Sequence, residues 1–139
     1  RPTPACLVSD DQLQLTLPIP PSINHQYATV NGRRILSAES RSYKQLVGGH
    51  VLIALAKNPK REHLRTLLQS HALILSMWFY LRTALRRDLD SGLKITQDAI
   101  CEALELNDNR VVEIHLHKKI DRNDPRLEVI LAPLGDDTT

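Results

Sequence analysis

Asp88 and Asp90, which are separated by one residue, are the side chains of this 139-residue chain best suited to take part in a chemical reaction. Where a chain is extended, residues two apart point to the same side, so both carboxylates would lie together while Leu89 points into the core. Two unpaired carboxylates at that distance repel each other, and a divalent cation relieves the repulsion. Mg²⁺ prefers oxygen ligands and keeps several waters, so a few carboxylates suffice to hold it. The pattern therefore indicates a candidate magnesium site.

Basic residues surround this aspartate pair. If a helix begins near Asp90, Lys94 lies one turn further on over the same face, where its ammonium could meet a phosphate oxygen or a developing negative charge. Arg86 and Arg87, immediately upstream, can hold a flanking phosphate. A plainer interpretation also stands, in which Asp90 only caps a helix and forms a surface ion pair with Lys94.

The middle of the chain is strongly basic. The formal net charge is only +2, but from Arg33 to Lys94 twelve Lys or Arg residues stand against four Asp or Glu residues, a local charge of +8. A positive region that carries two close aspartates fits a polyanionic substrate held near a cation site. A solvated basic face is the alternative that charge alone leaves open.

Length and composition indicate one globular domain. The chain is 42% apolar and 24% charged, and we expect residues 11–133 to form the domain between disordered tails at 1–10 and 134–139. Cys6 and Cys101 are expected to be free thiols in a reducing compartment, because two isolated cysteines make no zinc site. No segment approaches the roughly 20 apolar residues of a membrane span, and no signal-peptide pattern is present, so we expect a cytoplasmic protein.

Turn and periodicity signals predict the elements of the first half. Apolar residues alternate over 12–17, which predicts a strand that ends at Pro18. The pair Asn31-Gly32 predicts a hairpin over 29–36, and Ser37 can cap a helix over 38–56. Gly48-Gly49 would weaken that helix. The residues expected near its inner face are Tyr43, Leu46, Val47, His50, Ile53 and Ala54.

The second half is predicted to alternate between helices and strands. We expect a short helix over 60–69, a central strand over 71–80, and a helix over 91–104. Strands over 111–118 and 126–131 are expected to form a hairpin through the loop 121–125. The predicted inner residues are Leu93, Ile100, Ala103 and Leu104 on the helix, and Leu127, Val129 and Leu131, alternating against Glu128 and Ile130, on the last strand. This order predicts an α+β fold, a single domain in which two or three helices pack on one mixed β-sheet.

Several segments, in this order, resemble RusA-type Holliday junction resolvases, the crossover junction endodeoxyribonucleases. The segment Leu17-Pro18-Ile19-Pro20-Pro21-Ser22-Ile23-Asn24 looks like the Leu-Pro-x-Pro-Pro-Ser-x-Asn opening of that family. Arg87-Asp88-Leu89-Asp90, with Lys94 four residues later, is similar to its catalytic segment. Further similar segments are Ser37-Ala38-Glu39 with Tyr43, Leu106-Asn107-Asp108 with Val111, and Arg126-Leu127-Glu128, so the resemblance runs from about Leu15 to Leu131.

The resemblance implies a Mg²⁺-dependent endonuclease, for which Mn²⁺ could substitute. It would act as a homodimer with two active sites and resolve four-way DNA junctions by paired symmetric nicks in recombination and repair. It carries the family's metal ligands onto Asp88, Asp90 and Asp108, and its essential lysine onto Lys94. Asp108 depends on the resemblance alone, because its own context is that of an ordinary turn residue. The residues expected to position DNA are Asn24, Arg33, Arg34, Lys44, Arg86 and Arg87.

The sequence also departs from the family pattern. Ser91 stands where the family usually has Asn, and the segment before Val111 lacks the family's aromatic residue and paired aspartates. Two alternatives therefore stay open: a RusA-like nuclease that prefers flaps or forks, and a non-catalytic protein that binds branched DNA. The retained aspartates and Lys94 argue against the second, because a pure binder gains nothing from carboxylates that face phosphate.

Overall fold

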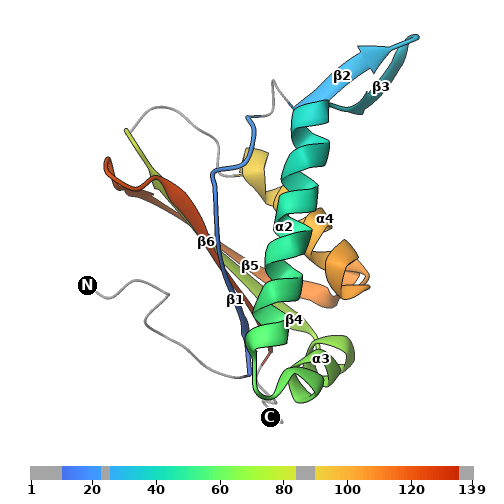
Figure 1. The fold of residues 1–139 in the computed structure, drawn as a ribbon, viewed down its shortest axis with the longest axis vertical. Helices are drawn as coiled ribbons and strands as arrows, with labels where there is room; N and C mark the ends of the chain where they lie inside the picture. The colour runs from blue at the N-terminus through green and yellow to red at the C-terminus, as the bar shows by residue number, and fades with distance from the viewer. Residues whose placement is uncertain (1–10, 23–25, 84–89, 135–139) are drawn as a thin grey trace.

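A four-stranded mixed sheet forms the centre of the molecule (Figure 1). The structure is a computed structural model, and it describes residues 11–22, 26–83 and 90–134. Strand β6 is antiparallel to both of its neighbours, whereas β5 is parallel to β4. The order across the sheet is β1 (Leu13–Leu17), β6 (Arg126–Pro133), β4 (Leu73–Leu81) and β5 (Val111–Ile120).

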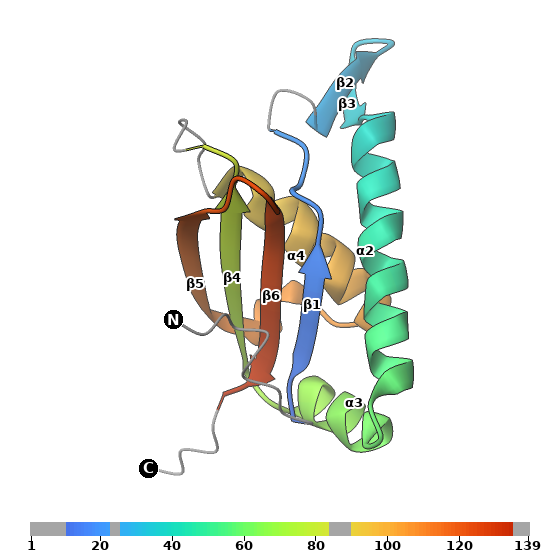
Figure 2. The same cartoon turned by 60° about the vertical axis from the view of Figure 1, so that its left-hand side comes forward.

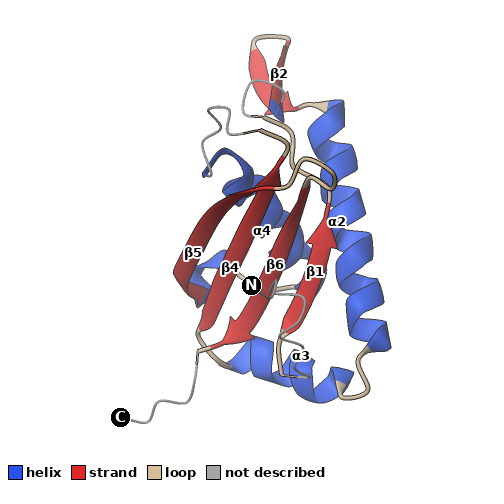
Figure 3. Cartoon of the chain, turned by 90° about the vertical axis from the view of Figure 1, so that its left-hand side faces the viewer, coloured by secondary structure: helices blue, strands red, loops and turns tan. Residues whose placement is uncertain are grey.

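Three helices in the described part of the chain cover one face of this sheet (Figures 2 and 3). They are α2 (Ala38–Lys57), α3 (Arg61–Ser70) and α4 (Asp90–Leu104). The predicted α+β architecture, a mixed sheet with helices packed on it, is confirmed.

The predicted central strand is confirmed as β4, which has neighbours on both sides. Its residues alternate between buried and half-buried, and the side chains of Leu75, Met77 and Phe79 are at most 1% exposed. Each large apolar side chain buried in this way contributes about 1.5–3 kcal/mol to folding. Their partners across β6 are the three apolar residues of the predicted alternation, Leu131, Val129 and Leu127.

The predicted hairpin and helix cap are also confirmed. Strands β2 (Tyr27–Val30) and β3 (Arg33–Leu36) pair antiparallel around Asn31 and Gly32. Both turn residues have positive φ, 53° and 75°, as a type I′ turn requires. The hydroxyl of Ser37 accepts a hydrogen bond from the backbone N–H of Ser40 at 3.1 Å and so caps α2.

The predicted inner face of α2 is wrong for three residues. Leu46 is 40% exposed and Ile53 is 55% exposed, and His50 also lies on the outer surface. Much of the helix is apolar all round, so periodicity in the sequence does not select a single face. The residues that do pack inward follow an i, i+4 stripe: Tyr43, Val47, Val51 and Leu55.

The inner face of α4 is only partly as predicted. Ile100 and Leu104 are buried, but Leu93 and Ala103 are only partly buried at the edge of the core. The buried residues that the prediction missed are Ile95, Thr96, Ala99 and Cys101.

The expected hairpin between the last two strands does not form. Instead, β4 lies between them, with β5 on one side and β6 on the other. Helix α4 connects β4 to β5, and a helical crossover of this kind places the second strand parallel to the first. The chain then crosses the end of β4, where the backbone N–H of Asp121 donates to the carbonyl of Leu81 at 2.8 Å.

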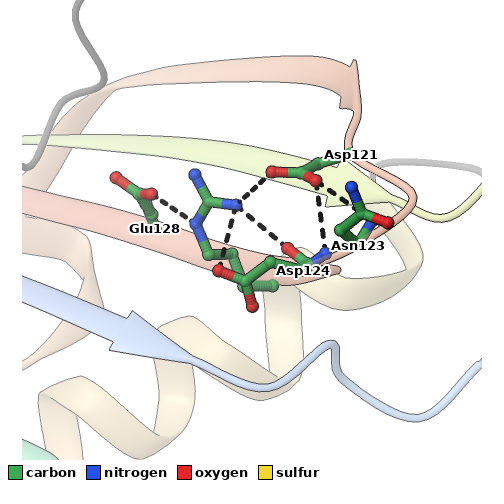
Figure 4. Close-up of polar contacts among 5 residues, drawn as sticks. Asp121, Asn123, Asp124 and Glu128 are labelled. Carbon is green, nitrogen blue, oxygen red and sulfur yellow. Dashed lines mark hydrogen bonds and ion pairs between the residues drawn. The ribbon is translucent and has the colours of Figure 1, made fainter.

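One arginine holds this crossing in place (Figure 4). The guanidinium of Arg126 donates to Asp121 at 2.9 Å and to Glu128 at 2.6 Å, and it lies 4.0 Å from the centre of the Tyr80 ring. Its hydrogen bond lowers the pKa of Asp121 below the usual value. Glu128, predicted on the polar side of its strand, is only 4% exposed, and the guanidinium of Arg126 is the positive charge that pairs with its buried carboxylate.

Candidate active site

The first two turns of α4 carry two of the candidate catalytic residues. The helix begins at Asp90, and Lys94 lies one turn further on, as the sequence predicts. The side chain of Lys94 is 72% exposed, and its Nζ lies 3.6 Å from an Oδ of Asp98, the next residue one turn along. Among the side chains that the structure describes, Lys94 pairs only with Asp98, and this exposed ion pair leaves its ammonium free to reach a bound anion.

Gly92 fixes this turn against the sheet. A Cβ atom at Gly92 would lie 2.9 Å from Cγ of Pro20 and 3.0 Å from Cε2 of Phe79, distances that real Cβ contacts rarely reach. The backbone of α4 thus approaches its neighbours more closely than any other residue would allow. Gly92 was not among the predicted site residues, although a glycine near the start of a predicted helix, where it costs about 1 kcal/mol, is a signal of such a close approach.

The proline segment that packs on Gly92 is itself anchored to α2 and to Gln26, which precedes β2. The hydroxyl of Tyr43 donates to the carbonyl of Pro18 at 2.7 Å, and the side-chain amide of Gln26 donates to the carbonyl of Pro21 at 2.9 Å. Prolines cannot donate backbone hydrogen bonds, so their carbonyls supply the contacts. The Leu-Pro-x-Pro-Pro motif therefore acts as a rigid support between α2 and the first turn of α4.

Asp108 does not lie in α4 but in the short helix that follows it. It opens the short 3₁₀ helix η2 (Asp108–Arg110), which follows α4 and is capped by the side chain of Asn107, accepting from the N–H of Asn109 at 3.0 Å. The pKa of the buried Cys101 thiol, in the last turns of α4, is raised to about 11 by burial first and then by the carboxylate of Asp108. Asp108 therefore sits beside the C-terminal end of α4.

Asp90 and Asp108 are consequently at opposite ends of the domain. Helix α4 has 15 residues, and at a rise of 1.5 Å per residue it is about 21 Å long. Contacts with β4 indicate the same separation. Gly92 packs on Phe79 near the end of β4, whereas Val111, just after η2, pairs with Leu73 at the start of β4. Those two positions on β4 are about 20 Å apart at 3.3 Å per residue.

The described residues do not form a metal centre by themselves. No group of three His, Cys, Asp or Glu side chains able to hold a metal ion occurs among the side chains that the structure describes, those of 11–22, 26–83 and 92–134. Mg²⁺–oxygen distances are about 2.0–2.1 Å, so ligands must converge closely. Asp88 lies outside the described residues, and within one chain Asp108 cannot join Asp90 on a common ion.

The residues expected to contact DNA are in several places. Arg33 and Arg34 lie on strand β3 of the projecting hairpin, where Arg34 stacks 4.2 Å from the ring centre of Tyr27. Lys44 bonds to Glu102 of α4 at 2.6 Å and is only 19% exposed, so its ammonium links two helices. Three further candidates lie outside the described residues: Asn24, Arg86 and Arg87.

Among the described residues, no helix is both long and apolar enough to cross a membrane.

Comparison with known proteins gives a consistent result. Residues 18–132 match the family described as Endodeoxyribonuclease RusA. A relative from Escherichia coli O139:H28, named crossover junction endodeoxyribonuclease RusA, is 29% identical over 124 residues, which cover 88% of this chain and 96% of the relative. The protein of the same name from Escherichia coli K12 is 28% identical over the same shares of both chains. The support of α4 by the proline motif lies inside the matched region, and the chain belongs to the RusA family of endodeoxyribonucleases.

Proposed function

We propose that this protein is a Mg²⁺-dependent, structure-specific endonuclease that resolves Holliday junctions by paired symmetric nicks. The observation that carries the proposal is the match to RusA endodeoxyribonucleases over 18–132, with relatives named for crossover junctions that align over 96% of their length. The close packing at Gly92, which holds the start of α4 two residues before the exposed Lys94, supports the proposal.

The chemistry is divided between the aspartates and the lysine. Asp88 and Asp90 would hold the ion, which when bound polarises the scissile phosphate and lowers the pKa of a coordinated water. Lys94 neutralises the charge that develops on the phosphate oxygens. Asp98, one turn further along α4, keeps the ammonium of Lys94 near this position without burying it.

The third ligand, Asp108, fits the ion only if it comes from a second copy of the chain. Within one chain the length of α4 separates Asp108 from Asp90 by about 20 Å. In a dimer whose two-fold axis is perpendicular to the strands, the β4 strands of the two copies run antiparallel. The start of β4 in one copy then lies beside the end of β4 in the other. That arrangement brings Asp108 of one copy towards the first turn of α4 of the other, and it does so twice.

A dimer of this kind suits the substrate. A two-fold homodimer repeats every contact, so it presents two equivalent sites to a four-way junction with two equivalent strands. The DNA backbone would be positioned by Arg33 and Arg34 of the hairpin and by Asn24, Arg86 and Arg87, whereas the pairing of Lys44 with Glu102 favours a packing role for that lysine.

A junction-cutting assay tests the proposal directly. Purified protein is mixed with a synthetic four-way junction in Mg²⁺, in Mn²⁺ and in EDTA, beside Asp90→Asn and Lys94→Ala variants. We expect paired nicks with either metal, binding without cutting in EDTA, and loss of cutting but not of binding in both variants. Junction binding without nicks in either metal would instead identify a non-catalytic binding protein.

A panel of branched substrates decides which structure is preferred. Flaps, forks and intact duplex of matched sequence are compared with the four-way junction at equal concentration. Faster cutting of the junction supports resolution as the activity. Faster cutting of flaps or forks would replace it with the related activity on replication structures, with the same catalytic residues.

A further inference from the structure

The hairpin β2–β3 stands out from the body of the molecule as an arm. In all three views it extends beyond the first turn of α2, at the same end of the molecule as the start of α4 (Figures 1, 2 and 3). Its base is fixed by hydrogen bonds from the N–H of Ser37 and the hydroxyl of Ser40 to the carbonyl of Gln26, at 2.9 and 2.8 Å. The guanidinium of Arg41 adds a bond to the carbonyl of Leu36 at 2.6 Å. The arm is thus firmly attached at one end and projects at the other.

The two faces of the arm differ in character. Cross-strand partners share a face, and the register pairs Val30 with Arg33 and Ala28 with Ile35. These four residues form one face, which we call the apolar face, and all of them are exposed, Val30 by 47% and Ile35 by 40%. On the opposite face Arg34 covers the ring of Tyr27.

The apolar face is not explained by folding. A two-stranded ribbon is only marginally stable in water, and large apolar side chains exposed on it add nothing to a core. The side chain of Arg33 beside them forms no ion pair with any other described residue. Val30 and Ile35 are therefore suited to contact a molecule that binds to the arm.

The charge of the arm identifies the occupant. Residues 26–36 contain two arginines and no aspartate or glutamate, so the ribbon attracts a polyanion and repels basic surfaces. Proteins that combine arginine with apolar wedges use the apolar side chains to enter between base steps and unstack them. Branched DNA offers base steps beside the branch point that unstack at lower cost than those of continuous duplex.

We propose that the arm is a wedge, in which Val30 and Ile35 pack against unstacked bases beside the branch point while Arg33 contacts the adjacent phosphate. This inference rests on the proposed function in that it takes branched DNA as the substrate. It adds a second element to recognition: α4 carries the chemistry, and the arm distinguishes a branch from continuous duplex.

The test replaces the apolar pair without weakening the strands. Val30→Thr/Ile35→Thr keeps β-branched side chains, which retain strand propensity, but makes the face polar. Leu52→Gln/Ile53→Gln is the matched control, because these residues are both 55% exposed and lie in the second half of α2, away from the arm. Circular dichroism spectra and melting temperatures establish that both double variants are folded.

The readouts separate unstacking from binding and cutting. The parent protein should raise the fluorescence of 2-aminopurine placed beside the branch point, with Ca²⁺ replacing Mg²⁺ so that no cutting occurs. The arm variant should lose most of this rise and bind the junction at least about fivefold more weakly, as expected for lost base contacts, with duplex binding unchanged. The control should behave as the parent.

The possible failures are distinct. If the parent neither binds nor cuts branched DNA, the proposed function fails. If the parent binds and cuts junctions while the arm variant shows the same fluorescence and affinity, only the wedge is excluded. A lower solution mass of the arm variant, with no change in fluorescence per bound junction, would make the arm a contact between copies and would also overturn the wedge.

Discussion

Complementation between two inactive variants tests whether each active site is shared between two chains. Asp90→Asn and Asp108→Asn each remove one carboxylate from every site of a homodimer. Loss of a metal ligand should lower the cutting rate of each variant by at least about 100-fold. In one chain the two aspartates are about 20 Å apart along α4, far beyond the reach of a single ion.

The fraction of active sites expected in the mixture of the two variants follows from counting the sites in each kind of dimer. If a site combines Asp90 of one chain with Asp108 of the other, a heterodimer of the two variants has one site that lacks both carboxylates and one that is intact. Random assortment of equal amounts makes about half of the dimers heterodimers, so about a quarter of all sites should be active. These dimers should leave a single nick in the junction rather than a symmetric pair.

The assay is co-expression or co-refolding of the two variants, followed by cutting of a junction labelled on each strand in turn. Different affinity tags on the two variants, purified one after the other, establish that heterodimers have formed. A mixture of the two variants that is as inactive as either alone would refute the shared site. Full activity of Asp108→Asn by itself would remove Asp108 from the ligand set altogether.

Three further predictions concern stability and reactivity. Gly92→Ala should crowd the first turn of α4 and cost about 1–3 kcal/mol, whereas Gly49→Ala, which meets nothing within 4 Å, should gain up to about 1 kcal/mol; thermal melting compares them. Arg126→Met leaves the buried Glu128 carboxylate without its cation and should cost about 3–5 kcal/mol by urea unfolding, and adding Glu128→Gln should restore part of this. Burial raises the pKa of Cys101 from 9.0 to about 11, so its protonated thiol stabilises the fold fully below pH 9 and progressively less as pH rises towards 11. The melting temperature should therefore fall more steeply between pH 9 and pH 11 in the parent than in Cys101→Ala. Equal slopes would contradict the assignment.

Much of the local structure follows from the sequence, because short-range signals determine it. The pair Asn31-Gly32 accepts positive φ at both positions and sets the register of the hairpin. Ser37 caps α2, and the alternation of β4 marks one face for burial. The motifs that indicated the RusA family are likewise local, and the family comparison confirmed the family that they indicated.

Tertiary structure decided how these pieces combine. Asp90 and Asp108 are close to the same predicted helix in the sequence, but the helix itself separates them, because about 21 Å of α-helix lies between its two ends. Adjacent strands in sequence, β5 and β6, are not adjacent in the sheet, because β4 takes the place between them. The close approach of Gly92 to Pro20 joins segments more than seventy positions apart. The sequence by itself thus predicted the residues of the aspartate and lysine site, and only the fold showed that the length of α4 keeps Asp90 and Asp108 apart within one chain.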